Sequence, residues 1–333
     1  MKDQKDIAIQ RFAAAYILPV TQDLLRSLEG IQSRNDTEDI HDLRVASRRI
    51  RTALLIFGDQ FSTKKVKNWL DAVRIITRNY GTTRDMDVQI SFLENLMKDI
   101  GDRRIRTGLY RIHLRLLQKR NKKNRMVDKH TDALLNDKNI LNMRTTTQEI
   151  CSSSADEQPP QKLYDLAFNT LQSALDQFLS YEVFIHHAEK IHELHLMRIA
   201  AKKLRYTMEV FTPLYSDEME PFLTIMKEIQ QQLGEIRDCD VWLEFIPTFV
   251  KKETKRTQEY YGRKDAIKRL LPGIEYLEQN RREERNRLYQ EFIKSWQSWR
   301  TQGVWLQFRE LILQATLSQA PENDNSMQPP ADR

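Results

Sequence analysis

The chain has 333 residues, of which 30% are charged, 40% are hydrophobic and only 9 are glycine. Few turn-forming residues beside many helix-forming ones predict a mostly helical protein, large enough for one large or two ordinary domains. The net charge is +6, but residues 1–160 hold 29 Lys+Arg against 21 Asp+Glu, whereas residues 161–333 hold 24 against 26. Because the excess of positive charge lies in the first half of the chain, a uniformly basic surface is excluded.

Targeting and redox signals are weak. No stretch reaches the roughly 18 uncharged apolar residues that suggest a membrane span, and the acid-containing N-terminus is unlike a signal peptide. Cys151 and Cys239 lie in dissimilar contexts, which indicates neither a disulfide framework nor a metal site. We therefore expect a cytoplasmic protein without a membrane partner.

The first elements expected along the chain are a helix over residues 7–30 and a cationic helix over residues 41–57, with the sequence HDLRVASRRIRTALLIF. A helix with periodic apolar residues follows at residues 66–79. The segment at residues 80–88 reads YGTTRDMDV. Each of these elements has a later counterpart.

The second half repeats the same order. A helical run over residues 163–190 precedes HLMRIAAKKLRYTMEVF at residues 195–211, which is displaced by 154 residues from its first copy. The segment LGEIRDCDV at residues 233–241 then corresponds to YGTTRDMDV, at a displacement of 153 residues. The match predicts a tandem duplication of a helical unit of roughly 150 residues.

The composition also places the boundaries of the duplication. The segment CSSSADEQPPQ at residues 151–161 is rich in Ser, acids and Pro and is typical of an exposed linker. We expect one helical-bundle repeat over residues 1–150 and a second over residues 162–317. Residues 318–333 are polar and contain proline, which is typical of a disordered tail.

Both copies of the cationic helix place positive side chains opposite an apolar face when they are plotted at 100° per residue. These side chains are His41, Arg44, Arg48 and Arg51, with Arg49 on the flank, and in the second copy His195, Arg198, Lys202 and Arg205, with Lys203 on the flank. A solvated surface is the common alternative for a charged face, but such faces normally interleave opposite charges. The first copy has no acid here and the second has only Glu209 nearby, which favours an anionic ligand.

The residue types narrow the class of anion. Arginine offers paired donors that fit phosphate oxygens, whereas single-strand binders also present aromatic side chains to the bases. The cationic faces contain one aromatic residue, Tyr206. They therefore favour a phosphate polymer without bases, and a nucleic-acid backbone remains the alternative.

The two cationic blocks, each followed by Arg-Asp-x-Asp-Val, resemble the CHAD domain family over about residues 8–313. The resemblance implies an all-α fold of two pseudo-symmetric four-helix-type bundles, which face each other across a basic groove or pore. It implies binding of inorganic polyphosphate without catalysis, cofactor or metal. Association with polyphosphate granules and with phosphate-metabolising proteins are further expectations.

Other cations are expected to extend this polyphosphate-binding set. They are Arg74, Arg78, Arg84, Lys227 and Arg237. Gln231 stands where Arg78 would recur, which predicts a weaker contact there in the second half.

The Arg-Asp-x-Asp segments could also be metal sites, but carboxylates two residues apart on a helix point about 200° away from each other. We expect Gly81 and Gly234 to end helices, so that the carboxylates after them complement the dipole of the next helix. One carboxylate of each pair is expected to orient Arg84 or Arg237.

Two further features bear on function. Residues 103–125 hold ten cations and no acid, and this run either extends the polyphosphate path or forms a separate patch for nucleic acid or a protein. Positive charge around His41 and His195 should disfavour the protonated ring in the empty protein.

Overall fold

The protein is almost entirely helical. The computed structural model describes residues 6–34, 37–153 and 158–318, and over these ranges it contains α-helices and short 3₁₀ turns but no strand. The helices of the first half are α1 Ile7–Arg34, α2 Thr37–Ile56, α3 Thr63–Lys98, α4 Arg103–Leu135 and α5 Lys138–Ser152. Those of the second half are α6 Gln161–Leu179, α7 Ile191–Phe211, α8 Glu220–Tyr261, α9 Leu271–Thr301 and α10 Val304–Ser318. The all-α prediction is confirmed.

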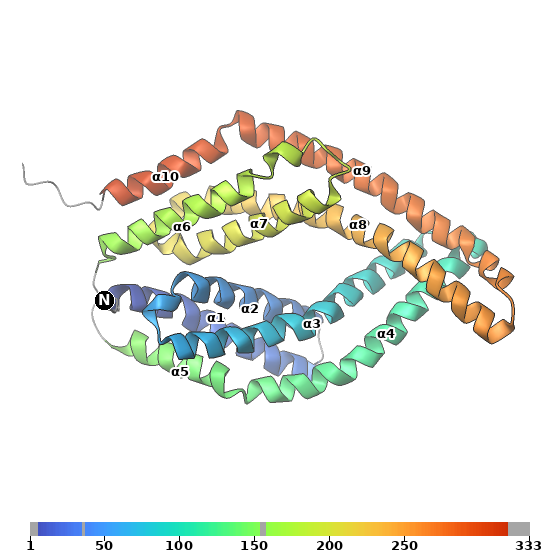
Figure 1. Cartoon of the computed structure of the whole chain (residues 1–333), viewed down its shortest axis with the longest axis horizontal. Helices are drawn as coiled ribbons and strands as arrows, with labels where there is room; N and C mark the ends of the chain where they lie inside the picture. The colour runs from blue at the N-terminus through green and yellow to red at the C-terminus, as the bar shows by residue number, and fades with distance from the viewer. Residues whose placement is uncertain (1–5, 35–36, 154–157, 319–333) are drawn as a thin grey trace, which may run out of the picture.

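The duplication is visible in the order of the helices. In Figure 1, α1, α2, α3 and α5 form the lower part of the molecule, and α6, α7 and α10 form the upper part. Each half has five α-helices within the described ranges, where four-helix-type bundles were expected. The additional helix is the short last one of each half: α5 packs on α1, and α10 packs on α6.

The middle of the expected linker and nearly all of the expected tail fall outside the described residues. Helix α5 ends at Ser152 and α6 begins at Gln161, close to the predicted seam. Residues 154–157 and 319–333 are not among the described ones. Within the described part of the chain, no helix is both long and apolar enough to cross a membrane.

The two halves meet first through an aromatic cluster at the ends of α2 and α7. The ring of Phe57 lies 5.9 Å from that of Phe12 and 5.8 Å from that of Phe211. Phe57 and Phe211 are fully buried and belong to one apolar core that includes residues of both halves. Aromatic burial of this kind contributes strongly to packing, so the halves share a core at this end.

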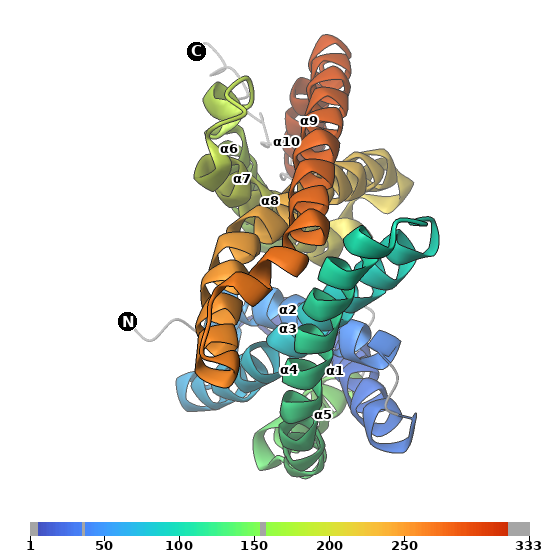
Figure 2. The ribbon, with the colours of Figure 1, turned by 90° about the vertical axis from the view of Figure 1, so that its right-hand side faces the viewer.

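The halves meet again where α4 crosses α9, and Figure 2 faces this end of the molecule. The crossing depends on two glycines that touch backbone to backbone. A Cβ atom at Gly273 would overlap the carbonyl oxygen of Ile105 and lie 2.8 Å from Cα of Gly108. A Cβ atom at Gly108 would likewise overlap the carbonyl oxygen of Leu270. The contacts are reciprocal, as expected at a pseudo-twofold axis.

A second apolar core surrounds this crossing. It contains buried residues of α3, α4, α8 and α9, among them Leu93, Leu109, Trp242 and Leu277. The long helices α3 and α8 therefore run from the shared core at one end to the second core at the other. The space between these two cores is bounded by α2 and α3 of one half and α7 and α8 of the other.

We expect Gly273→Ala to destabilise the protein, because the new methyl group must displace backbone atoms of α4 that cannot rotate away. Overpacking of this kind costs about 1–3 kcal/mol, which thermal unfolding followed by circular dichroism would detect as a lowered Tm. Gly101→Ala is the matched control, since a Cβ atom there meets nothing within 4 Å. Equal melting temperatures for the two variants would contradict the proposed role of the crossing.

Candidate functional site: a cationic groove between the halves

A cavity of about 480 Å³ lies between the two halves and is lined by α2, α3, α7 and α8. From the first half it receives four of the predicted side chains: His41, Arg44, Arg48 and Arg84. From the second half it receives their counterparts: His195, Arg198, Lys202 and Arg237. Eight of the fifteen predicted ligand-binding residues thus meet in one groove.

The two repeated glycines lie against the groove arginines. Gly81 and Gly234 lie inside α3 and α8, so the prediction that they end helices is wrong. A Cβ atom at Gly81 would lie 2.7 Å from Nη1 of Arg44, and one at Gly234 would lie 3.7 Å from Nε of Arg198. Gly81 therefore lets Arg44 lie close against the backbone of α3, whereas a Cβ atom at Gly234 would make an ordinary van der Waals contact with Arg198.

The two carboxylates of each Arg-Asp-x-Asp segment face different neighbours. Asp85 lies in the groove, 3.7 Å from the guanidinium of Arg44, whereas Asp87 accepts a hydrogen bond of 2.9 Å from Arg120 on α4. Asp238 and Asp240 repeat this division: Asp238 lines the groove and Asp240 pairs at 2.5 Å with another residue, Arg285 of α9. The carboxylates of one segment therefore do not share one ion.

Arg84 and Arg237 are held by glutamates, not by the neighbouring aspartates as predicted. Arg84 lies 3.9 Å from Glu38, at the start of α2. Arg237 donates to Glu244, two turns further along α8, at 2.7 Å. Both glutamates are largely exposed, so these pairs form the rim of the groove.

The centre of the groove has more positive than negative charge. Among the described residues, Arg48 and Lys202 have no carboxylate within 4 Å, and Nη1 of Arg44 and Nε of Arg198 are buried without a hydrogen-bond partner. Only 14% of the Arg44 side chain is exposed. The groove members of the cationic faces are therefore enclosed between the halves.

This concentration of charge perturbs the titration of its members. Burial, then the charges of Arg198, Arg48 and Arg44, lower the pKa of Lys202 to about 7. Burial is also the main cause that lowers the pKa of Arg198, and Arg48 across the groove adds to it. Positive charge on one half thus acts on cations of the other half.

The histidine prediction is confirmed in direction for His195. Burial, followed by the charges of Arg237 and Arg198, lowers the pKa of its imidazole. Its Nδ1 atom is buried without a hydrogen-bond partner among the described residues. His41 is exposed at the groove edge, beside Glu38 and Asp42, whose ligating atoms lie within 4.8 Å of one another.

Two of the predicted cations bind Glu209, and one of these pairs joins the halves. Arg49 of α2 donates to Glu209 of α7 at 2.8 Å, and Arg205 pairs with the same carboxylate at 3.0 Å. The guanidinium of Arg205 also lies 4.8 Å from the ring centroid of Tyr206. Neither arginine lines the groove.

The other predicted cations also lie outside the groove. They are Arg51, Arg74, Arg78, Lys203 and Lys227. Arg74 pairs with Asp71, Lys203 with Gln177 and Lys227 with Glu220. These polar contacts on exposed side chains are ordinary for a solvated surface.

Some groove residues were missed by the sequence analysis. Asp85 and Asp238 were interpreted as helix-start residues, and Val88, Val241 and Trp242 were not considered. The signal was present in the repeated Asp-x-Asp-Val segment, which places an aspartate and a residue three positions later on the same side of a helix.

The chain matches one family model and is similar in fold to solved structures. The profile of the CHAD domain matches residues 15–247. The crystal structure of the CHAD domain from the plant Ricinus communis superposes with a TM-score of 0.58 and 18% identity, covering 85% of this chain and 88% of that one. PptA from Streptomyces chartreusis gives a TM-score of 0.54 and 13% identity, covering 86% of this chain and 99% of that one. Comparison with curated proteins gives no match.

We expect Arg48→Gln to raise the pKa of Lys202 toward the ordinary lysine value of about 10.4, because the substitution removes a positive charge that disfavours the ammonium form. The pKa can be measured by NMR on the protein with ¹³C-dimethylated lysines. Arg51→Gln is the control, since Arg51 is exposed and does not line the groove. An unchanged Lys202 pKa in Arg48→Gln would show that these cations are not coupled.

Proposed function

The chain belongs to the CHAD domain family, and we propose that it binds inorganic polyphosphate in the groove between its two halves. The observation that carries this proposal is the cluster of Arg44, Arg48, Arg198 and Lys202, four enclosed cations of which only Arg44 has a carboxylate within 4 Å among the described residues. Like charges in a partly buried site repel one another. A polyanion that enters the groove replaces this repulsion with attraction.

The donors suit phosphate oxygens. Arg44 and Arg198 have guanidinium N–H groups without a partner in the described structure, and a guanidinium can offer two parallel hydrogen bonds to a phosphate. Lys202 adds an ammonium to the same groove once it is protonated. Asp85 and Asp238 lie beside the arginines and limit the net charge of the empty groove.

A ligand without bases fits the groove better than nucleic acid does. Among the described lining residues, Trp242 supplies the only indole or phenyl ring, and it is 3% exposed within the second core. Bases therefore find no exposed indole, phenol or phenyl ring in the groove on which to stack. Nucleic acid bound through its backbone is the alternative that the competition experiment below addresses.

The proposed role is binding and not catalysis. The groove aspartates are adjacent to arginines and so have an electrostatic role that needs no reaction. Binding of this kind would place the protein at polyphosphate granules in the cytoplasm, near phosphate-metabolising proteins. Fluorescence microscopy of the tagged protein together with a polyphosphate stain tests whether the two co-localise.

We expect the double variant Arg48→Gln/Arg198→Gln to bind long-chain polyphosphate on the order of 100-fold more weakly. Each lost charge-assisted contact contributes about 1.5–3 kcal/mol, and 1.4 kcal/mol corresponds to a factor of ten. The matched control is Arg74→Gln/Arg78→Gln, which removes the same charge from residues outside the groove. Affinities can be measured by fluorescence anisotropy at fixed salt.

An equal loss of affinity in both double variants would show that binding depends on the overall charge and not on the groove. In a second experiment, unlabelled polyphosphate and single-stranded or duplex DNA compete for the labelled polyphosphate at equal phosphate concentration. We expect polyphosphate to compete better than either DNA. Displacement at parity by DNA would favour the nucleic-acid alternative.

A further inference from the structure

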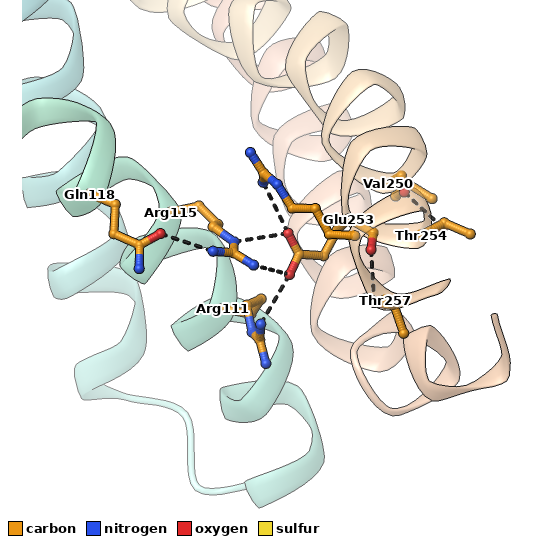
Figure 3. A network of polar contacts seen from close by, with 8 residues as sticks. Arg111, Arg115, Gln118, Val250, Glu253, Thr254 and Thr257 are labelled. Carbon is orange, nitrogen blue, oxygen red and sulfur yellow. Dashed lines mark hydrogen bonds and ion pairs between the residues drawn. The ribbon is translucent and has the colours of Figure 1, made fainter. Parts of the chain in front are cut away.

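A second cluster of arginines lies far from the groove, at the end of α8. Glu253 is only 1% exposed and accepts hydrogen bonds from three guanidiniums. Arg115 of α4 donates through Nε and Nη2 at 2.9 and 2.8 Å, Arg111 of α4 at 3.0 Å, and Arg256 of α8 at 3.2 Å. Figure 3 shows Arg111 and Arg115 reaching from α4 to Glu253. Three positive charges thus surround one negative charge.

This cluster is separate from the groove. Glu253 lies fifteen residues beyond Asp238 on α8, which is about 22 Å at 1.5 Å per residue. Between them, Trp242, Ile246 and Phe249 belong to the second apolar core. A phosphate chain that leaves the groove therefore has no continuous cationic path along α8 to this cluster.

The cluster also has no counterpart in the first half. At the displacement of 153 residues, Glu253 corresponds to Ile100, which lies beyond the end of α3 at Lys98. Helix α8 continues to Tyr261. The groove is made of duplicated residues, whereas this cluster depends on a helical extension that only one half has.

The arginines keep donors for a ligand. Arg111 and Arg256 each use one nitrogen on Glu253 in the described structure, and their side chains are 38% and 50% exposed. A guanidinium has five N–H donors. Burial opposes ionisation of Glu253, but hydrogen bonds from Arg115 and Arg256 hold its pKa below the usual range, so it stays anionic and fixes the guanidiniums.

Two tyrosines complete the surface. Tyr260 and Tyr261 are 83% and 62% exposed, and their ring centroids lie 5.0 Å apart at an interplanar angle of 75°. They line the same cavity, of about 520 Å³, as Arg111, Arg115 and Arg256. Glu259 also lines it, but its carboxylate lies 3.7 Å from Lys255.

We propose that this arginine–tyrosine cavity binds a nucleotide, with the phosphates on Arg111 and Arg256 and the base against Tyr260 or Tyr261. Exposed rings beside guanidiniums are the combination by which proteins hold bases and phosphates together. The groove has no such rings, and inorganic polyphosphate makes no use of them. The cavity volume lies within the range of about 300–1,000 Å³ of small-molecule sites. A free nucleoside triphosphate and one nucleotide of a single-stranded RNA share this chemistry.

The proposal can be tested by calorimetric titration with ATP and with inorganic tripolyphosphate, both in the Arg48→Gln/Arg198→Gln background so that the groove contributes little. We expect Tyr260→Ala/Tyr261→Ala to weaken ATP binding by roughly 5- to 150-fold, since stacking contributes about 1–3 kcal/mol per base, and to leave tripolyphosphate binding unchanged. Arg111→Gln/Arg256→Gln should weaken both ligands, while Arg115 still holds Glu253. Tyr110→Ala is the control, an exposed tyrosine of α4 outside this cavity.

Titration with a short single-stranded RNA shows whether the cavity binds a free nucleotide or one nucleotide of a strand. Tighter binding of the RNA than of ATP, with the same loss in the tyrosine variant, would assign the cavity to a strand; the reverse order would assign it to the free nucleotide. Equal affinities of ATP and tripolyphosphate would overturn the proposal, and so would an ATP affinity that does not change in the tyrosine variant.

Discussion

Repulsion between enclosed cations is the constraint on which the rest of the structure depends. Arg44 and Arg48 on α2 face Arg198 and Lys202 on α7, and positive charge on α2 lowers the pKa values of the cations on α7. Charges of one sign held this close would separate if the halves were free to move. The fold prevents this by joining the halves at both ends of the groove. One junction is a shared aromatic core and the other is the glycine-mediated crossing of α4 and α9.

The duplication explains why one groove has two matching walls. Each copy supplies a cationic helix and a long helix with a glycine under its arginine, and the reciprocal contact of Gly108 and Gly273 lies between the copies. The copies have also diverged. Glu209 of α7 binds Arg49 across the interface, whereas the corresponding residue of α2 is Leu55. A single carboxylate therefore joins the halves beside the groove without neutralising its centre.

The repeat and the helical periodicity predicted the all-α fold and the eight basic residues that line the groove, because both depend on local sequence patterns. They could not show that Arg49 and Arg205 lie outside the groove, because Glu209 contacts Arg49 only after the halves have packed. The prediction that Gly81 ends a helix was based on the general preference of glycine for helix ends. Its place inside α3 is explained by tertiary contact with Arg44, which overrides that preference. The side of a helix on which a residue lies was thus predictable from the sequence. The contacts that a residue makes with another helix were not.

The most direct test of the central claim is the pKa of Lys202 in the presence and absence of saturating polyphosphate, measured by NMR on the ¹³C-dimethylated protein. In the empty groove, burial and neighbouring cations hold this pKa at about 7. A phosphate chain in the groove favours the ammonium form and should raise the pKa well above that value. If polyphosphate binds to saturation while the pKa of Lys202 stays near 7, the ligand does not occupy the groove between the halves.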